Sequence, residues 1–110
     1  MMFDPFGLVL EVFNELYPAK AATVVWRQGM RESGNACYGC TDFEHVPPIV
    51  SVDVDLPVAG AVDVLAHELA HVAAGFEEDH GPAWEAAFGA IHQRYSERVE
   101  ALEAEQELAA

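Results

Sequence analysis

Residues 57–75 read Pro-Val-Ala-Gly-Ala-Val-Asp-Val-Leu-Ala-His-Glu-Leu-Ala-His-Val-Ala-Ala-Gly, and they carry the clearest secondary-structure pattern of the chain. Its apolar residues recur at helical spacing, at Val58, Val62, Leu65, Leu69 and Val72. Pro57 suits the first turn of a helix, and Gly75 suits the position just after one. Gly60 weakens the first turn by up to about 1 kcal/mol relative to alanine, so regular structure is expected to begin near Ala61. The stretch predicts a central helix with one buried face.

The first part of the chain predicts another helix and a strand. Between Asp4 and Tyr17 the apolar residues recur at steps of three and four, and Pro18 follows, which is typical of an amphipathic helix. The β-forming residues from Ala22 to Arg27 predict a strand. The Gly- and Ser-containing stretch from Gly29 to Gly39 predicts a loop or hairpin after it.

A second strand is predicted immediately before the central helix. From Ile49 to Leu56, valines alternate with Ser51, Asp53 and Asp55, which is the period-two pattern of a half-buried strand. The carboxylates on its polar side favour an edge strand, because edge strands use charge to resist unwanted pairing. Such an edge is expected to be able to align an extended peptide by backbone pairing.

The last part of the chain predicts a C-terminal helix. Pro82 can open it after an acidic turn at 76–80, and its buried stripe would be Trp84, Phe88, Ile91, Tyr95, Val99 and Leu102. Residues 100–110 are rich in Ala and Glu, so they are expected to form a solvated helix end or a flexible tail. No repeat or linker divides the chain. Residues 1–110 are therefore expected to form a single α+β domain with an N-terminal helix, a short antiparallel or mixed sheet, the central helix and a C-terminal helix.

Composition limits the classes of partner. The chain has 110 residues and a formal net charge of −14, from 19 acidic residues against 5 Lys and Arg. Such a surface repels phosphate backbones, so no direct nucleic-acid binding is expected, and basic or neutral partners are favoured. Residues 1–12 contain no Lys or Arg, and the apolar runs are shorter than the roughly 20 residues of a membrane span. We therefore expect a cytoplasmic protein without a membrane segment. The oligomeric state stays open.

The central helix carries the residues that suggest chemistry, His67-Glu68-Leu69-Ala70-His71. Two imidazoles four residues apart lie on one helix face, one turn from each other, which suits a single zinc ion. Glu68 would project beside the metal and serve as the general base that takes a proton from a metal-bound water. This pattern predicts one catalytic Zn²⁺ ion and a zinc-dependent hydrolase.

A catalytic zinc normally has three protein ligands, so one more must come from outside this turn. His80 is the preferred candidate because it follows the Gly75 break closely enough for the chain to double back. Glu85 is the rival. Asp63 lies one turn before His67 and could orient that imidazole through a hydrogen bond, or it could be an exposed acid in a first helical turn.

The segment His67-Glu68-Leu69-Ala70-His71 followed by His80-Gly81-Pro82-Ala83-Trp84 resembles the SprT-like family and related minimal gluzincin-type zinc metallopeptidases, over about Val62 to Phe88. The resemblance implies a zincin-like domain and a polypeptide substrate. It implies zinc binding by His67, His71 and His80, with Glu68 as the base. Family members often carry a zinc ribbon after the catalytic region, where this chain has an acidic segment, so the resemblance transfers the chemistry and not a role on DNA.

Several roles stay open at this stage. His92 and Tyr95 are candidates for stabilising the transition state, although Tyr95 also fits the buried stripe and His92 also fits an exposed position. Cys37 and Cys40 could be ordinary thiols, a redox pair or, with His45, half of a second zinc site. The alternatives to a peptidase are a non-catalytic zinc-binding module with an acidic interaction surface and a zinc hydrolase of a non-peptide amide.

Overall fold

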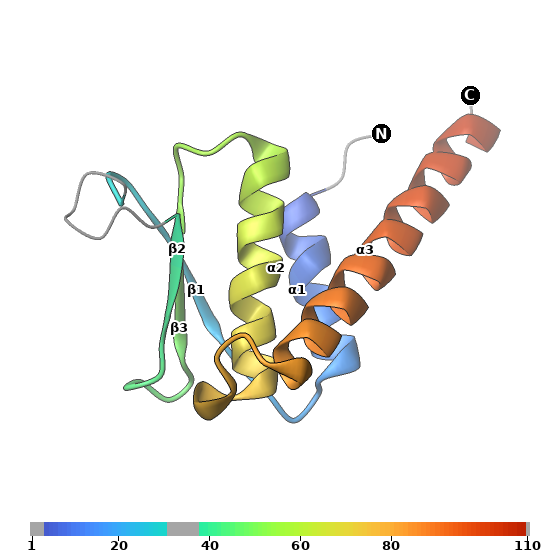
Figure 1. The fold of residues 1–110 in the computed structure, drawn as a ribbon. Coiled ribbons are helices and arrows are strands. Elements are labelled where there is room, and N and C mark those ends of the chain that lie inside the picture. The colour runs from blue at the N-terminus through green and yellow to red at the C-terminus, as the bar shows by residue number, and fades with distance from the viewer. Residues whose placement is uncertain (1–3, 31–37, 110) are drawn as a thin grey trace.

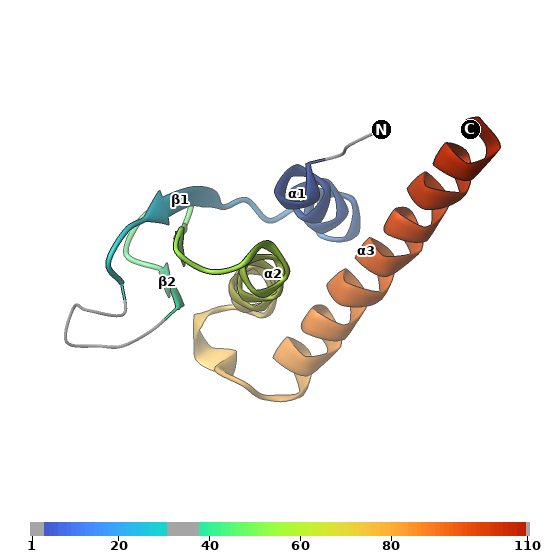
Figure 2. The ribbon, with the colours of Figure 1, turned by 90° about the horizontal axis from the view of Figure 1, so that it is seen from above.

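The computed structural model describes residues 4–30 and 38–109. In chain order it contains α1 (Pro5–Leu16), β1 (Thr23–Arg27), β2 (Gly39–Asp42), β3 (Ile49–Asp53), α2 (Val58–Ala74), a short 3-10 helix η1 (Phe76–Glu78) and α3 (Pro82–Ala109). Seen from above, the sheet lies on one side of α2, and α1 and α3 lie on the other (Figure 2). The predicted α+β class and order of elements are confirmed.

The sheet is mixed and has the order β1-β3-β2. β1 pairs with β3 in parallel, with Thr23 opposite Ile49, and β2 pairs with β3 antiparallel, with Gly39 opposite Val52. The prediction that the segment from Ile49 forms an edge strand is therefore wrong, because β3 has a neighbour on each side. The edge strand that contacts α2 is β2.

The polar side of β3 is buried, which the alternating pattern does not reveal. Ser51 is 3% exposed and Asp53 is 1% exposed. Ser51 Oγ accepts a hydrogen bond from Arg27 Nε at 3.0 Å, which compensates for its loss of water. Asp53 Oδ1 accepts the backbone N–H of Asp55 at 2.8 Å, and this local turn ends the strand at Asp53 instead of the predicted Leu56.

β2 is the strand that the sequence pattern does not predict. Its four residues, Gly39 to Asp42, contain no run of β-branched or aromatic side chains. The sequence leaves a loop or a hairpin open from Gly29 to Gly39, and a hairpin of β1 with β2 is not observed, because both strands pair with β3. The strand exists because it pairs with β3 and packs on α2. Residues 31–37 of the predicted loop lie outside the described residues.

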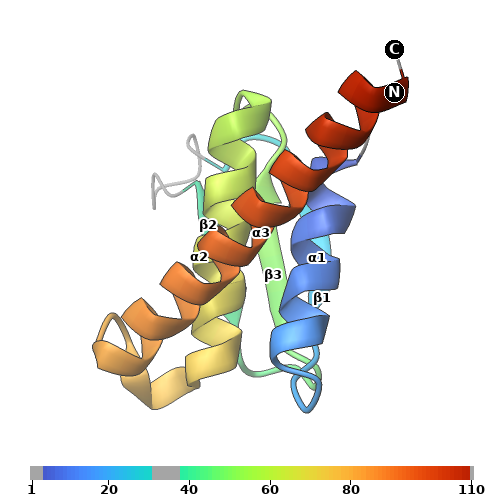
Figure 3. The same ribbon diagram turned by 90° about the vertical axis from the view of Figure 1, so that its right-hand side faces the viewer.

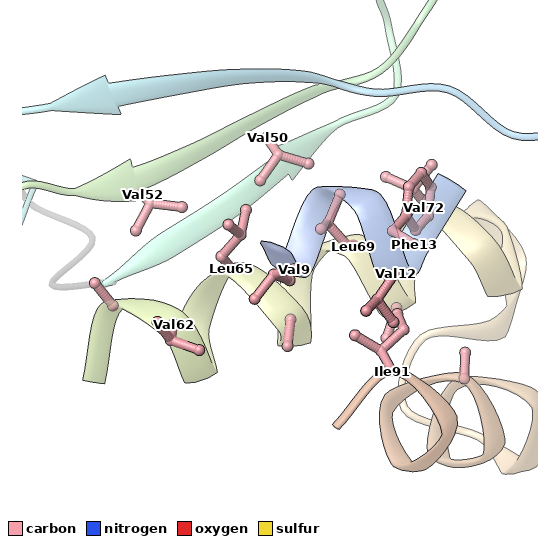
Figure 4. Packing of buried hydrophobic residues seen from close by; sticks show 14 residues of the cluster. Val9, Val12, Phe13, Val50, Val52, Val62, Leu65, Leu69, Val72 and Ile91 are labelled. Atoms are coloured by element: carbon pink, nitrogen blue, oxygen red, sulfur yellow. The ribbon is translucent and has the colours of Figure 1, made fainter. Parts of the chain in front are cut away.

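The hydrophobic core is centred on α2 (Figure 4). Val62, Leu65, Leu69 and Val72 of the predicted stripe are buried, whereas Val58 is 59% exposed because it precedes the packed part of the helix. The core is completed from β3, α1 and α3 by Val50, Val52, Val9, Val12, Phe13, Ala87 and Ile91. The alanines at 61, 66 and 70 are also buried. Their short side chains allow neighbouring helices to pack closely against α2.

α3 crosses α2 and α1 diagonally and then projects beyond them (Figures 1 and 3). Its helical conformation continues through residues 100–109, so the helical form of the predicted C-terminal segment is the one observed. Arg94 Nη2 donates to Glu15 Oε1 at 2.9 Å, and Arg98 also bonds Glu15, which joins α3 to α1. Within residues 4–30 and 38–109, no helix combines the length and apolar character needed to cross a membrane.

Candidate metal centre

Three imidazoles converge at one end of the molecule. His67 and His71 project from α2, and His80 lies in the turn between η1 and α3. His67 Nε2 is 3.2 Å from His71 Nε2 and 3.2 Å from His80 Nε2. One ligand atom from each residue lies within 4.8 Å of the others. A tetrahedral zinc ion with Zn–N distances of about 2.0–2.1 Å holds its ligands roughly 3.3–3.4 Å apart, so the donor set fits this metal.

Local backbone features bring His80 back to α2. Gly75 ends the helix with φ 98°, a value that favours glycine, and its N–H donates to the carbonyl of His71 at 2.9 Å. Asp79, with φ 51°, then turns the chain. Asp79 Oδ1 lies 3.5 Å from His80 Nδ1, whereas the other ring nitrogen of His80, Nε2, faces His67. The carboxylate can therefore orient the imidazole so that Nε2 stays available to a metal.

Trp84 and Phe88 of α3 form an aromatic wall beside the three histidines. Trp84 Nε1 donates to the carbonyl of His67 at 3.2 Å, and its ring centroid is 4.7 Å from that of His80. The Phe88 centroid is 6.0 Å from that of His67. The helical spacing predicts a buried stripe that includes both aromatic residues, and they do pack on the core, but they also shield one side of the candidate site.

Burial keeps the two helix imidazoles in the form that binds metal. The pKa of His67 is lowered by burial and by the nearby His80. The pKa of His71 is also lowered, mainly by burial, although Glu68 opposes the shift. Neutral imidazoles are the species that coordinate zinc. Protons should therefore compete with zinc less strongly at this site than at an exposed pair of histidines.

In the metal-free protein, His67 and His71 are expected to titrate below the ordinary histidine pKa of 6.5. The unfolded chain then binds more protons than the folded chain between 6.5 and the folded pKa values. These two groups should therefore make the fold lose stability as the pH falls through that interval. NMR titration of the assigned ring nitrogens measures the midpoints, and values above 6.5 would contradict the burial argument.

Glu68 lies next to this cluster, and its carboxylate is hydrogen-bonded to a strand of the sheet. Its side chain is 10% exposed, and Oε2 lies 4.0 Å from His67 Nε2. Thr41 of β2 donates its hydroxyl hydrogen bond to Glu68 Oε1 at 2.7 Å. Burial raises the pKa of Glu68, while the Thr41 hydrogen bond and the charges of His71 and His80 oppose that shift. A carboxylate whose pKa is raised is a better proton acceptor, as a general base requires.

Thr41 is a functional candidate that the sequence does not reveal, since no local signal connects β2 to α2. A Thr41→Val substitution keeps the shape of the side chain but removes the donor, so Glu68 would be less well oriented. In a zinc hydrolase of the kind that the sequence motif predicts, kcat should fall about tenfold. Thr41→Ser should restore most of the rate because it keeps the hydroxyl. Equal rates in the valine and serine variants, with both folded by circular dichroism, would remove Thr41 from the site.

Gly39 allows β2 to approach this close. A Cβ built on Gly39 would lie 2.5 Å from Val64 Cγ1 and 3.2 Å from Glu68 Cγ. Contacts of 2.5 Å are sterically forbidden, so any larger residue would push β2 away from α2 or force Val64 to move. The position of Thr41 therefore depends on this glycine.

The other predicted residues lie outside the histidine cluster. Glu85 is exposed on the first turn of α3 and does not belong to the group that could share an ion. Asp63 Oδ1 lies 3.8 Å from Nε2 of His92, so its polar partner comes from the neighbouring helix α3. Of the two alternatives for Asp63, the exposed acid is the one observed, because 64% of its side chain is exposed and its polar neighbour is His92 instead of His67.

His92 and Tyr95 lie further along α3. His92 is exposed and stacks on Phe88, and Tyr95 packs against the core, where burial raises its pKa. Neither residue lines the hollow beside His67 and Glu68, whereas Tyr38 does. Transition-state stabilisation by His92 or Tyr95 stays a prediction. Cys40 is exposed on β2, and Cys37 lies outside the described residues.

Two hollows lie along β2, and His67 lines the smaller of them. The smaller, about 330 Å³, lies toward the start of β2 and includes His67, Glu68 and Phe88 in its lining. The larger, about 650 Å³, lies toward the end of β2 and includes Thr41, Phe43 and Phe76 in its lining.

Comparisons with family models, curated proteins and solved structures found no match to this chain. The basis for assigning its chemistry is therefore this geometry together with the sequence motif.

Proposed function

We propose that this protein is a zinc-dependent metallopeptidase of the SprT-like type that uses Glu68 as its general base. The observation that carries the proposal is the convergence of three imidazole nitrogens from His67, His71 and His80 next to a buried carboxylate. Three histidines leave a fourth zinc position open, as catalytic sites do, whereas structural sites are usually closed by four ligands and favour cysteine.

In this mechanism, a bound zinc ion supplies a water of lowered pKa and a Lewis acid for the scissile carbonyl. His67, His71 and His80 would hold the ion, and Trp84, which packs against His80, would shield one side of the site from water. Glu68 takes a proton from the attacking water and delivers it to the leaving amine. Thr41 holds Glu68 in position for both transfers.

An extended polypeptide is the substrate that best suits the surroundings of these residues. β2 is an edge strand, and among the described strands it pairs only with β3. Peptides bind such edges by backbone hydrogen bonds and place alternate side chains in flanking pockets. The two hollows along β2 would take those side chains. The substrate-aligning role that the sequence suggested for the segment from Ile49 is therefore reassigned to β2.

Metal analysis combined with a proteolysis assay tests this proposal. Purified protein should contain one zinc ion per chain and should cleave an unfolded protein such as casein. A chelator should abolish cleavage, and one equivalent of zinc should restore it. Two zinc ions per chain would instead indicate a second site, for which Cys37, Cys40 and His45 are the candidates.

The same assay separates the alternative functions. Tightly bound zinc without cleavage of proteins or small amides would contradict an enzyme and support a non-catalytic binding module. Cleavage of small amides without cleavage of peptides would support a hydrolase of non-peptide substrates. The net charge of −14 predicts that added DNA changes none of these results.

A further inference from the structure

The smaller hollow beside the histidine cluster combines apolar walls with acidic groups. One wall is a stretch of α2, which contributes Asp63, Val64, His67 and Glu68. The facing walls are Phe88 of α3 and the residue pair 38–39 at the start of β2. Within the described chain, none of its lining residues is a Lys or Arg. A bound side chain would therefore meet apolar surface along its length and negative charge at the ends.

Asp63 marks the open end of this hollow. Its side chain is 64% exposed, whereas that of Glu68, beside the histidines, is 10% exposed. His92 Nε2 lies 3.8 Å from Asp63 Oδ1, and the His92 ring stacks on Phe88, so the acid lies beside the wall of the hollow. Asp63 precedes His67 by four residues, which places the two about one helical turn, roughly 6 Å, apart along α2.

From these features we propose that the hollow binds a lysine or arginine side chain of the substrate, from a residue next to the scissile bond, with Asp63 contacting the cation. This inference rests on the proposed peptidase activity. The four-carbon stem of lysine can span one helical turn, and long basic side chains pack their methylenes on apolar surface while the charge stays near water. Tyr38 and Phe88 add aromatic surface, which also attracts cations.

The charge of the rest of the protein favours the same substrates. The described arginines bond groups outside the hollow: Arg94 and Arg98 bond Glu15, and Arg27 bonds Ser51. Because no described lining residue of the hollow is a Lys or Arg, the negative potential of the acidic chain is not offset there. This potential should raise the local concentration of basic peptides. An acidic side chain in this hollow would face both Asp63 and Glu68, so it should be rejected.

Peptide cleavage by the zinc-loaded protein tests the inference. Each peptide carries lysine, norleucine or glutamate on one or the other side of the cleaved bond. Norleucine has the four-carbon stem of lysine without its charged ammonium group. We expect kcat/KM to favour lysine over norleucine roughly fivefold, mainly through KM, because an exposed charge contact acts in the bound substrate as well as in the transition state. Glutamate should be the poorest of the three.

Two variants show which acid is responsible. Asp63→Asn should abolish the preference for lysine over norleucine, while Glu103→Gln, which removes one charge from the distal part of α3, should keep it. Cleavage without a lysine preference, or a preference that survives Asp63→Asn, would overturn this inference and leave the peptidase proposal standing. If no peptide is cleaved by zinc-loaded protein, the peptidase proposal fails and this inference fails with it.

Discussion

Replacing Glu68 with glutamine is expected to lower kcat for peptide cleavage by about 10²- to 10⁴-fold, the range that general acid–base catalysis contributes. Glutamine has nearly the same shape and can still accept the hydrogen bond from Thr41, but it cannot take up the proton of the attacking water. The three histidines are unchanged, so zinc content should stay at one ion per chain. Metal analysis and steady-state kinetics on the same preparation measure both quantities.

Although Glu68→Gln should lower activity, it should keep or raise the stability of the fold. Burial holds the pKa of Glu68 above its ordinary value of 4.5, so the metal-free fold loses stability as the pH rises and the carboxylate ionises. At neutral pH, Glu68→Gln removes that cost, and its thermal midpoint should equal or exceed that of the parent. Glu103→Gln is a control that should keep the parent activity. An active Glu68→Gln enzyme would exclude Glu68 as the base.

Replacing His80 with alanine is expected to weaken zinc binding at least about a hundredfold. Even groups that only orient a ligand contribute about 10- to 100-fold to metal affinity, so loss of a direct ligand should cost at least that much. Glu85, the rival candidate for the third zinc ligand, provides the matched comparison. Glu85→Ala should bind zinc as the parent does, because Glu85 is exposed and outside the histidine group.

Competition with a chromophoric chelator measures both affinities. His80 lies in a turn on the surface, so its removal should leave circular dichroism of the metal-free protein unchanged. If Glu85→Ala loses zinc while His80→Ala keeps it, the ligand assignment is wrong, and the chain between η1 and α3 must rearrange when it binds metal. Loss of zinc in both variants would indicate that the two residues cooperate in the site.

The helical part of the site could be predicted from the sequence because helix geometry is local. His67 and His71 share a face whenever residues 58–74 are helical, whatever surrounds them. The buried stripe from Val62 to Val72 and the end at Gly75 follow from the same periodicity and from backbone preferences of single residues. Pro82 opens α3 for a similar reason.

The sheet could not be predicted in the same way, because strand pairing joins segments that are distant in sequence. The alternation from Ile49 onward indicates a strand but carries no information about its neighbours, so it does not reveal the central position of β3 or the burial of Ser51 and Asp53. β2 has no local signal at all. Its pairing with β3 and its contact with α2 are what make it a strand.

Local sequence patterns are therefore enough to predict the α+β class, the central helix and the placement of Glu68 between His67 and His71 on that helix. Tertiary packing places His80, and not its rival Glu85, beside His67 and His71. It also joins Thr41 to Glu68 and leaves Asp63 facing a hollow instead of orienting His67. The physical reason is the range of the interactions. Helical spacing depends on backbone geometry over a few residues, whereas these contacts depend on how the sheet and α3 pack around α2.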